Sequence, residues 1–315
     1  MDTLSLIVSS TLLMSAPLIF TALGGLLSER AGVVNIGLEG LMIMGAFSGI
    51  VFNLTFADTF GAWTTLLATL FAMVCSGVFA LFHAVATITF RADHIISGTA
   101  LNFLALGLTV FLTKIIYGKG QTDTISQNVA YSNIPILQDI PFIGQIFFQR
   151  ISFYSYIAII VAIVIWFVLN KTVFGLRLRS VGEHPLAADT MGIKVNRMRY
   201  IAVIMSGMLG GIGGALYAQS FTNNFNATTI AGQGFMALAA LIFGKWNPLG
   251  ALGAGLFFGF AQSLAVIGGS LPFFSHWPTI IMQILPYVLT ILALAGLIGK
   301  AEGPKANGVN YVKPK

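Results

Sequence analysis

Charged side chains are scarce in this sequence. Asp, Glu, Lys and Arg make up 8% of its 315 residues and apolar residues make up 57%, whereas a soluble domain has roughly 25% charged residues. The apolar residues lie in successive runs of about 20, the length of a membrane-spanning helix. The composition excludes a soluble globular domain and predicts an all-α polytopic membrane protein. We assign residues 1–300 to one integral membrane domain and residues 301–315 to a basic cytoplasmic tail.

Groups that carry enzyme chemistry are also few. The one cysteine, Cys75, lies in an apolar run, which excludes an internal disulfide and a cysteine-based metal site. No lysine lies in the G-x-x-x-x-G-K-[ST] pattern of a P-loop, and the G-x-S-x-G pattern of acyl transfer is absent. We therefore expect no catalytic residues, no metal and no cofactor bound by this chain. The histidines are widely spaced, so we expect structural or surface roles for His83, His94, His184 and His276.

The hydropathy pattern predicts nine spans. Segment 232–243 is too short for a full crossing, so it is a half-helix or part of a broken helix. Glycines four residues apart, such as Gly207 and Gly211, predict close packing between helices. The predicted spans are 5–27, 33–52, 62–88, 95–117, 151–170, 200–218, 232–243, 247–268 and 277–299.

Basic residues are concentrated in two segments. Residues 171–199 hold six Lys or Arg and two acids, a net charge of +4, and residues 300–315 hold four Lys and one acid, a net charge of +3. Lys and Arg collect on the cytoplasmic side of membrane proteins. Placing both segments inside puts the N-terminus outside, the C-terminus inside and the neutral segment 118–150 outside. The pI near 9.5 then reflects membrane anchoring and not nucleic-acid binding.

A few polar residues lie at membrane depth. Glu39 follows Asn35 by one helical turn, so on a helix both would share a face. A carboxylate there usually faces a cavity or a partner, so Glu39 either lines a transport pathway or pairs with Arg30. Neighbouring glycines indicate a broken helix. Polarity and expected depth select the candidate pathway residues Asn35, Glu39, Asn102, Asn224 and Gln233.

Two segments far apart in the chain resemble each other. NIGLEGLMIMGA at 35–46 aligns with TIAGQGFMALAA at 229–240, which matches Glu39-Gly40 to Gln233-Gly234. In the orientation above, the first segment enters the membrane from the cytoplasm and the second from outside. This arrangement is typical of an inverted-topology repeat, in which paired interrupted helices flank a pathway at the membrane midplane.

The basic segment 171–199 contains a predicted short helix from Pro185 to Met191. Pro185 suits the first helical position and Gly192 suits the position after the helix. A helix of about seven residues is not stable alone, so it needs a surface, and Ala187 and Ala188 would allow close contact. We favour docking into a cytosolic subunit. The alternative is an amphipathic loop held at the lipid interface by Arg177, Arg179, Arg197 and Arg199.

Four stretches are distinctive in combination: ERAGVVNIGLEGLMIMGAF (29–47), ISGTALNFLALGLT (96–109), FGLRLRSVGEHPLAADTMGI (174–193) and GQGFMALAALIFGKWNPLGALGAGLFFG (232–259). They resemble the permease subunits of bacterial binding-protein-dependent ABC importers, in the branch that carries ribose, galactose and nucleosides. The third stretch resembles the family's coupling segment, although Glu183-His184 replaces the more usual Glu-Asn or Asn-rich sequence. The resemblance implies ATPase-coupling roles for Gly175, Arg177, Gly182, Glu183, Pro185, Ala187, Ala188 and Gly192.

Within that branch, the NIGLEG stretch is most similar to permeases that work with a basic-membrane-protein-type lipoprotein receptor. This resemblance implies nucleosides as the substrate class and a multi-pass location in the bacterial cytoplasmic membrane. It also implies three partners: a cytosolic ABC ATPase that binds ATP and Mg²⁺, a second permease in a heterodimer, and the extracytoplasmic lipoprotein. Transport would proceed by ATP-driven alternating access.

Two alternatives stay open beside this interpretation. The same machinery could carry a monosaccharide such as ribose or galactose. An ion-coupled secondary transporter acting without ATP belongs to a different class, and the scarcity of charge inside the spans argues against it. A membrane scaffold without transport activity fits poorly with the glycine-rich, interrupted helices.

Overall fold

The computed structural model describes residues 3–129, 131–132, 144, 151–270, 281, 284, 288, 291 and 302–313. Most of the predicted span 277–299, part of the predicted external segment 118–150, and His276 lie outside these residues.

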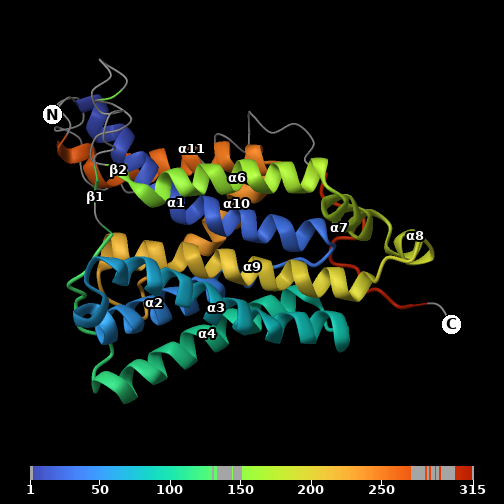
Figure 1. Cartoon of the computed structure of the whole chain (residues 1–315), viewed down its shortest axis with the longest axis horizontal. Helices are drawn as coiled ribbons and strands as arrows, with labels where there is room; N and C mark the ends of the chain where they lie inside the picture. Colours follow the sequence, from blue (N-terminus) through green and yellow to red (C-terminus); the bar gives the residue numbers. More distant parts are fainter. Residues whose placement is uncertain are drawn as a thin grey trace.

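Long apolar helices make up most of the described chain (Figure 1). Two shorter helices, α7 (Val173–Glu183) and α8 (Pro185–Thr190), lie together at one end of the molecule, near the C-terminus. Two-residue strands β1 (Tyr131–Ser132) and β2 (Ile151–Ser152) pair antiparallel. The longer apolar helices are α1 (Thr3–Arg30), α2 (Leu38–Phe60), α3 (Thr64–Ala84), α4 (His94–Tyr117), α6 (Phe153–Lys171), α9 (Val195–Tyr217) and α11 (Pro248–Ile267), and α10 (Gln233–Phe243) is a shorter apolar helix.

Six helical stretches of the described chain are apolar and long enough to cross a membrane. The longest, Leu38–Thr89, has 52 residues, about 78 Å at 1.5 Å per residue and more than twice the hydrocarbon thickness. It folds back at a 3₁₀ turn, Gly61–Trp63, where Gly61 has a φ of +51°. Helices α2 and α3 therefore pack beside each other. These features confirm an all-α polytopic membrane protein; the count of nine spans and the orientation stay predictions.

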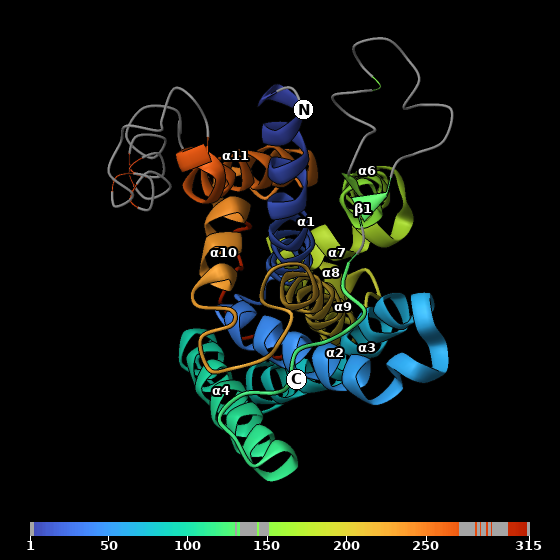
Figure 2. The ribbon, with the colours of Figure 1, turned by 90° about the vertical axis from the view of Figure 1, so that its left-hand side faces the viewer.

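Helix α9 lies at the centre of the bundle (Figure 2). It packs against α1 on one side and against α2 and α3 on the other. A Cβ atom on Gly211 would lie 2.6 Å from the carbonyl oxygen of Ala72 in α3, and one on Gly214 would overlap the backbone of Met42 in α2. The close packing predicted from the glycine spacing is confirmed for this helix.

Several predicted boundaries are wrong. The span predicted at 33–52 is helical only from Leu38 and continues to Phe60. The segment predicted as one long loop, 171–199, contains α7 and the first turn of α9 as well as α8. Hydropathy depends only on how apolar a segment is. It does not show where side chains from other helices bind the backbone and replace helical hydrogen bonds.

Candidate functional site

The connection between α1 and α2, residues 31–37, is not helical although most of it is buried. Backbone N–H and C=O groups outside a helix need other partners inside a membrane. At Val34 two histidines supply them: Nδ1 of His94 accepts from the N–H (3.2 Å), and Nε2 of His83 donates to the carbonyl oxygen (3.0 Å). The structural role expected for these two histidines is confirmed. We call residues 31–37 the α1–α2 connector.

Two predicted pathway residues also hold the connector. Asn35 is fully buried, and its Nδ2 donates to Oγ of Ser206 in α9 (2.9 Å). Asn102 in α4 donates from Nδ2 to a connector carbonyl (3.1 Å) and accepts at Oδ1 from the N–H of Gly40 (2.7 Å). Because Asn35 precedes α2, the prediction that it shares a helix face with Glu39 is wrong.

Glu39, in the first turn of α2, binds the N-terminus of α10. Its Oε1 accepts from the N–H of Gly232 (2.6 Å) and its Oε2 accepts from the N–H of Gly234 (2.7 Å). The first N–H groups of a helix have no partner within it, and the helix dipole favours an anion there. Glu39 does not pair with Arg30, whose Nε donates to the carbonyl of Trp246 (2.8 Å). We call the contact between Glu39 and the N-terminus of α10 the α2–α10 junction.

The junction unites the two segments that the sequence alignment paired. A Cβ atom on Gly234 would overlap the backbone of Glu39, so the first turns of α2 and α10 touch. Gln233 lies at the same junction, where its Oε1 accepts from Nε2 of Gln262 in α11 (2.9 Å). Asn224 belongs to the segment after α9, and its carbonyl accepts a local hydrogen bond from Oγ1 of Thr222 (2.8 Å). The inverted repeat stays a prediction.

A second buried polar cluster was missed by the sequence analysis. Asn53 of α2 donates from Nδ2 to Oε1 of Gln219 (3.1 Å), and Gln219 donates from Nε2 to Oγ1 of Thr69 in α3 (3.2 Å). Asn53 and Gln219 are fully buried. In the sequence each stands next to a predicted external segment and so suggests a solvated helix end. The bonds that join Asn53, Gln219 and Thr69 span 150 or more residues, and Nδ2 of Asn53 also donates to the carbonyl of Gln127, 74 residues away (2.7 Å). No local pattern reveals these partners.

The basic segment forms two helices with local caps. Oγ1 of Thr172 accepts from the N–H of Gly175 (3.2 Å) at the start of α7, and Nδ1 of His184 accepts from the N–H of Ala187 (3.3 Å) at the start of α8. Gly192 has a φ of +80° just after α8, a conformation that glycine adopts without strain. The predicted short helix is confirmed and ends within one residue of its predicted end.

Helix α8 has an outer and an inner face. Ala187 is exposed on the outer face with Leu186 (45% exposed) and Met191 (81% exposed). Ala188 is only 3% exposed and belongs to the hydrophobic core. The expectation that both alanines face a partner is therefore corrected: Ala187 alone of the two is available on this chain's surface.

Glycines hold α7 against the membrane helices. A Cβ atom on Gly175 would overlap the backbone at Leu169 of α6, and one on Gly182 would overlap the carbonyl of Arg30 at the end of α1. These two predicted coupling residues thus act in packing, while Arg177 and Glu183 are exposed.

Residues 302–313, which we call the C-terminal strap, lie across the same end of the molecule as α7 and α8 (Figure 1). The N–H of Ala306 donates to the carbonyl of Gly182 (2.9 Å), and the N–H of Gly308 donates to the carbonyl of Gly32 in the connector (3.1 Å). Asn310 accepts at Oδ1 from Nε2 of His94 (3.1 Å). The strap therefore joins the end of α7 to the connector and to α4, which the description as a basic tail did not anticipate.

The strap also covers a buried cation. Arg199 of α9 is 1% exposed, and its Nη1 donates to the carbonyl of Val309 (2.9 Å). The alternative in which Arg199 holds a loop at the lipid interface is therefore wrong for this residue. At the end of the strap, Nζ of Lys313 lies 3.9 Å from Oδ2 of Asp189 in α8.

A bundle of apolar helices with buried polar contacts, and a short capped helix exposed beside it, is typical of a multi-pass membrane protein. Residues 7–294 match the family described as branched-chain amino acid transport system / permease component, and the chain belongs to this family. It is a multi-pass protein of the cytoplasmic membrane.

Three relatives cover most of this chain. It is 58% identical to the guanosine ABC transporter permease protein NupQ of Bacillus subtilis (strain 168), over 99% of this chain and 98% of the relative. It is 54% identical to the nucleoside ABC transporter permease protein NupC of Lactococcus lactis subsp. cremoris (strain MG1363), over 100% and 99%. It is 24% identical to the guanosine ABC transporter permease protein NupP of Bacillus subtilis (strain 168), over 95% and 86%.

Proposed function

We propose that this chain is a translocation subunit of an ABC importer for nucleosides. The observation that carries the proposal is the 58% identity to a guanosine permease over 99% of this chain. The match extends over 312 residues, nearly the whole length of both proteins. The monosaccharide alternative has no comparable support.

Three partners complete the proposed machine. The names NupQ and NupP describe two guanosine permease proteins of one organism, and this chain is 58% identical to the first and 24% identical to the second. We therefore assign this chain to one half of a heterodimer, with a more distant permease as the other half. A cytosolic ATPase supplies ATP and Mg²⁺ chemistry, and an extracytoplasmic lipoprotein delivers the nucleoside.

The proposed orientation places α7, α8 and the strap in the cytoplasm, with nine spans, the N-terminus outside and the C-terminus inside. The exposed face of α8, with Leu186, Ala187 and Met191, is then the surface that meets the ATPase. Two other exposed coupling residues, Arg177 and Glu183, lie on α7, which precedes α8.

We place the substrate pathway along the α2–α10 junction. Glu39, Gln233 and their neighbours are polar groups at the meeting point of a full-length helix and a helix of 11 residues. Asn35 and Asn102 hold the connector that leads into this point. Motion of α7 and α8 is transmitted to the junction through the strap, because the strap is hydrogen-bonded to both α7 and the connector. Asn224 is the least supported pathway candidate, because the hydrogen bond that involves it is a local one to Thr222.

Uptake of labelled guanosine, uridine and ribose by cells with and without this gene tests the substrate class. We expect nucleoside uptake to fall on deletion and to return when the chain is supplied again, with ribose uptake unchanged. Loss of ribose uptake alone would contradict the proposal.

Reconstitution separates ATP-driven import from ion coupling. The purified assembly, in proteoliposomes supplied with the lipoprotein, should take up guanosine only when ATP is present on the ATPase side. A protonophore should leave that uptake unchanged. Uptake that needs an ion gradient and no ATP would favour a secondary transporter.

A further inference from the structure

A basic cavity lies beside the coupling helices. It has a volume of about 820 Å³ and lies between α7, the α8–α9 connection and the start of α9. Its lining includes the exposed cations Arg177, Lys194 and Arg197 and no acidic residue. Neither of the two ion pairs found in the described residues involves these cations. The cavity therefore carries positive charge without a counter-ion from the described part of this chain.

The wall of this cavity continues a lipid-exposed helix face. Val173 and Leu176 on α7 are 64% and 61% exposed, and both line the cavity. They follow Phe167 and Val164 of α6, which are 54% and 51% exposed. Apolar side chains so exposed on a membrane helix face the acyl chains. The basic cavity thus opens at the boundary between the hydrocarbon region and the aqueous phase.

A second, apolar cavity, which we call the apolar groove, lies farther along α9 than the basic cavity. Arg197 and Ile201 line the basic cavity, while Ile204 and Met208 line a second cavity of about 200 Å³ against α3. Arg197 and Ile204 are two helical turns apart, about 10 Å along the axis. These residues follow one another along a single face of the helix.

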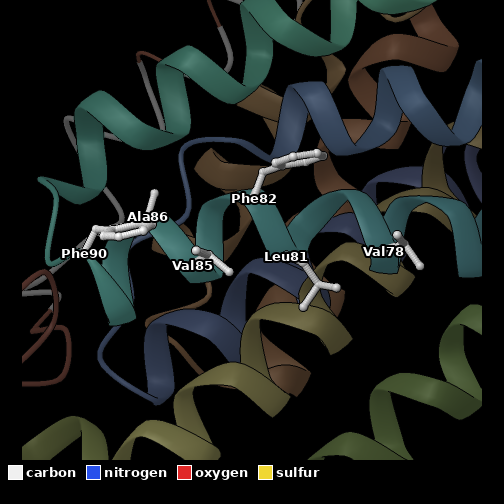
Figure 3. A pocket seen from close by; sticks show the side chains of 6 residues that line it. All are labelled: Val78, Leu81, Phe82, Val85, Ala86 and Phe90. Carbon is white, nitrogen blue, oxygen red and sulfur yellow. The ribbon is translucent and has the colours of Figure 1, made fainter.

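The α3 side of the groove is apolar as well. Val78 and Leu81 line the second cavity and also a third, of about 530 Å³, that contains Phe82, Val85 and Phe90. Figure 3 shows Leu81 and Phe82 on opposite sides of α3, with apolar side chains along its length. The α3 wall of the apolar groove is therefore apolar, and it joins the third cavity at Val78 and Leu81.

We propose that Arg177, Lys194 and Arg197 bind the phosphate of an anionic phospholipid of the cytoplasmic leaflet, and that its acyl chain lies in the apolar groove between α3 and α9. Basic pockets between helices on the cytoplasmic side suit anionic headgroups. Arg and Lys donate charge-assisted hydrogen bonds to phosphate oxygens. The proposal rests on the orientation given above and is independent of which solute is carried. Bound lipid would fix the position of α7 relative to α9, next to the coupling helix.

Lipid titration of the purified assembly tests the headgroup site. Native mass spectrometry with dioleoyl phosphatidylglycerol should show one tightly bound lipid per copy of this permease, in preference to dioleoyl phosphatidylcholine. The variant K194Q/R197Q should bind phosphatidylglycerol roughly 25-fold more weakly, because each of the two cations near an anionic lipid contributes about a fivefold gain in affinity. Arg177 stays intact in this variant because it belongs to the proposed coupling segment.

Two further variants make the test specific. K119Q/K245Q removes the same charge at exposed positions outside the cavity and should bind the lipid as the parent protein does. V78W fills the groove at an exposed position, 58% exposed in the parent chain. It should weaken binding of dioleoyl phosphatidylglycerol several-fold and leave the short-chain dihexanoyl lipid unaffected.

Three outcomes would overturn the proposal. Equal binding of the two dioleoyl lipids would show that the site does not select an anionic headgroup. Unchanged phosphatidylglycerol binding by K194Q/R197Q would show that the lipid does not bind in the basic cavity. Loss of the second permease or of the ATPase from the K194Q/R197Q assembly, with lipid binding unchanged, would show that a protein subunit occupies the groove.

Discussion

The starts of α8 and α10 are capped in different ways. His184 caps α8 from a position three residues before Ala187. Glu39 binds the N-terminus of α10 from a position 193 residues away from Gly232. The first cap is a local feature of the sequence, and the second exists only because α2 and α10 meet.

This difference bears on how each helix can move. Helix α8 keeps its cap when it shifts as a unit, because the cap travels with it. Separation of α2 from α10 has to break two hydrogen bonds between a carboxylate and backbone N–H groups. In the proposed function, the helix that receives force is small and self-contained, whereas the proposed pathway lies at a contact between distant segments of the chain.

We expect the largest loss of stability from Glu39→Ala, which removes the side chain that binds the start of α10. It leaves the N–H groups of Gly232 and Gly234 without their acceptor, and bonds to charged groups contribute about 1.5–3 kcal/mol each. We expect a loss of about 3 kcal/mol or more in stability, read as a lower melting temperature in detergent, and a loss of guanosine uptake. Glu39→Gln keeps one carbonyl acceptor and should lose less. Equal stability of Glu39→Ala and the parent chain would show that the junction contributes nothing.

The next effect concerns the two alanines of α8. Ala187→Glu adds a charge on the exposed face, so we expect the chain to fold normally. The amount of ATPase that copurifies with it should fall at least tenfold. Ala188→Glu places a carboxylate in the core, and burial of an unpaired charge is strongly destabilising. It should lower the melting temperature and the yield. Intact ATPase binding by Ala187→Glu would contradict the assignment of the docking face.

A smaller effect is expected from loosening the strap. Asn310→Ala removes the bonds to His94 and to the carbonyl of Arg91 (2.7 Å), which together contribute about 1–2 kcal/mol. We expect slower guanosine uptake at unchanged ATPase copurification, because the face of α8 is untouched. Lys313→Gln removes only an exposed contact of 3.9 Å and serves as the control. If Asn310→Ala and Lys313→Gln behave alike, the strap does not transmit motion from α8.

The smallest effect is expected from the local cap. His184→Ala should destabilise α8 by about 1 kcal/mol, the usual contribution of an N-cap. The readout is faster amide hydrogen exchange at Ala187 and its neighbours, with the melting temperature nearly unchanged. His184→Asn supplies another good cap and should restore slow exchange. A large drop in melting temperature with His184→Ala would show that this cap acts on more than its own helix.

Much of the fold follows from the sequence. Runs of apolar residues predict most of the membrane helices, because a helix is the structure that satisfies its own backbone in lipid. Pro185 and Gly192 delimit α8 to within one residue, because proline and glycine act on the backbone where they stand. The sequence also singles out Glu39, Asn102 and Gln233, because polar side chains within apolar spans need partners or a cavity.

The partners of those polar groups could not be predicted. The predicted span 33–52 includes Asn35, yet histidines and an asparagine from α3 and α4 bind the backbone there. Asn53 and Gln219 lie just beyond the predicted ends of the spans 33–52 and 200–218, and both are fully buried. In each case the deciding contact comes from a residue more than 45 positions away.

The sequence by itself determined the class of protein, most of the helices and the short helix α8, because hydropathy and local capping depend on neighbouring residues. Only the tertiary structure decided that the α1–α2 connector is not helical, that Glu39 binds α10, that Ala188 is buried and that the strap covers Arg199. These features arise from hydrogen bonds and packing between helices, and their free energy exists only once the helices have come together.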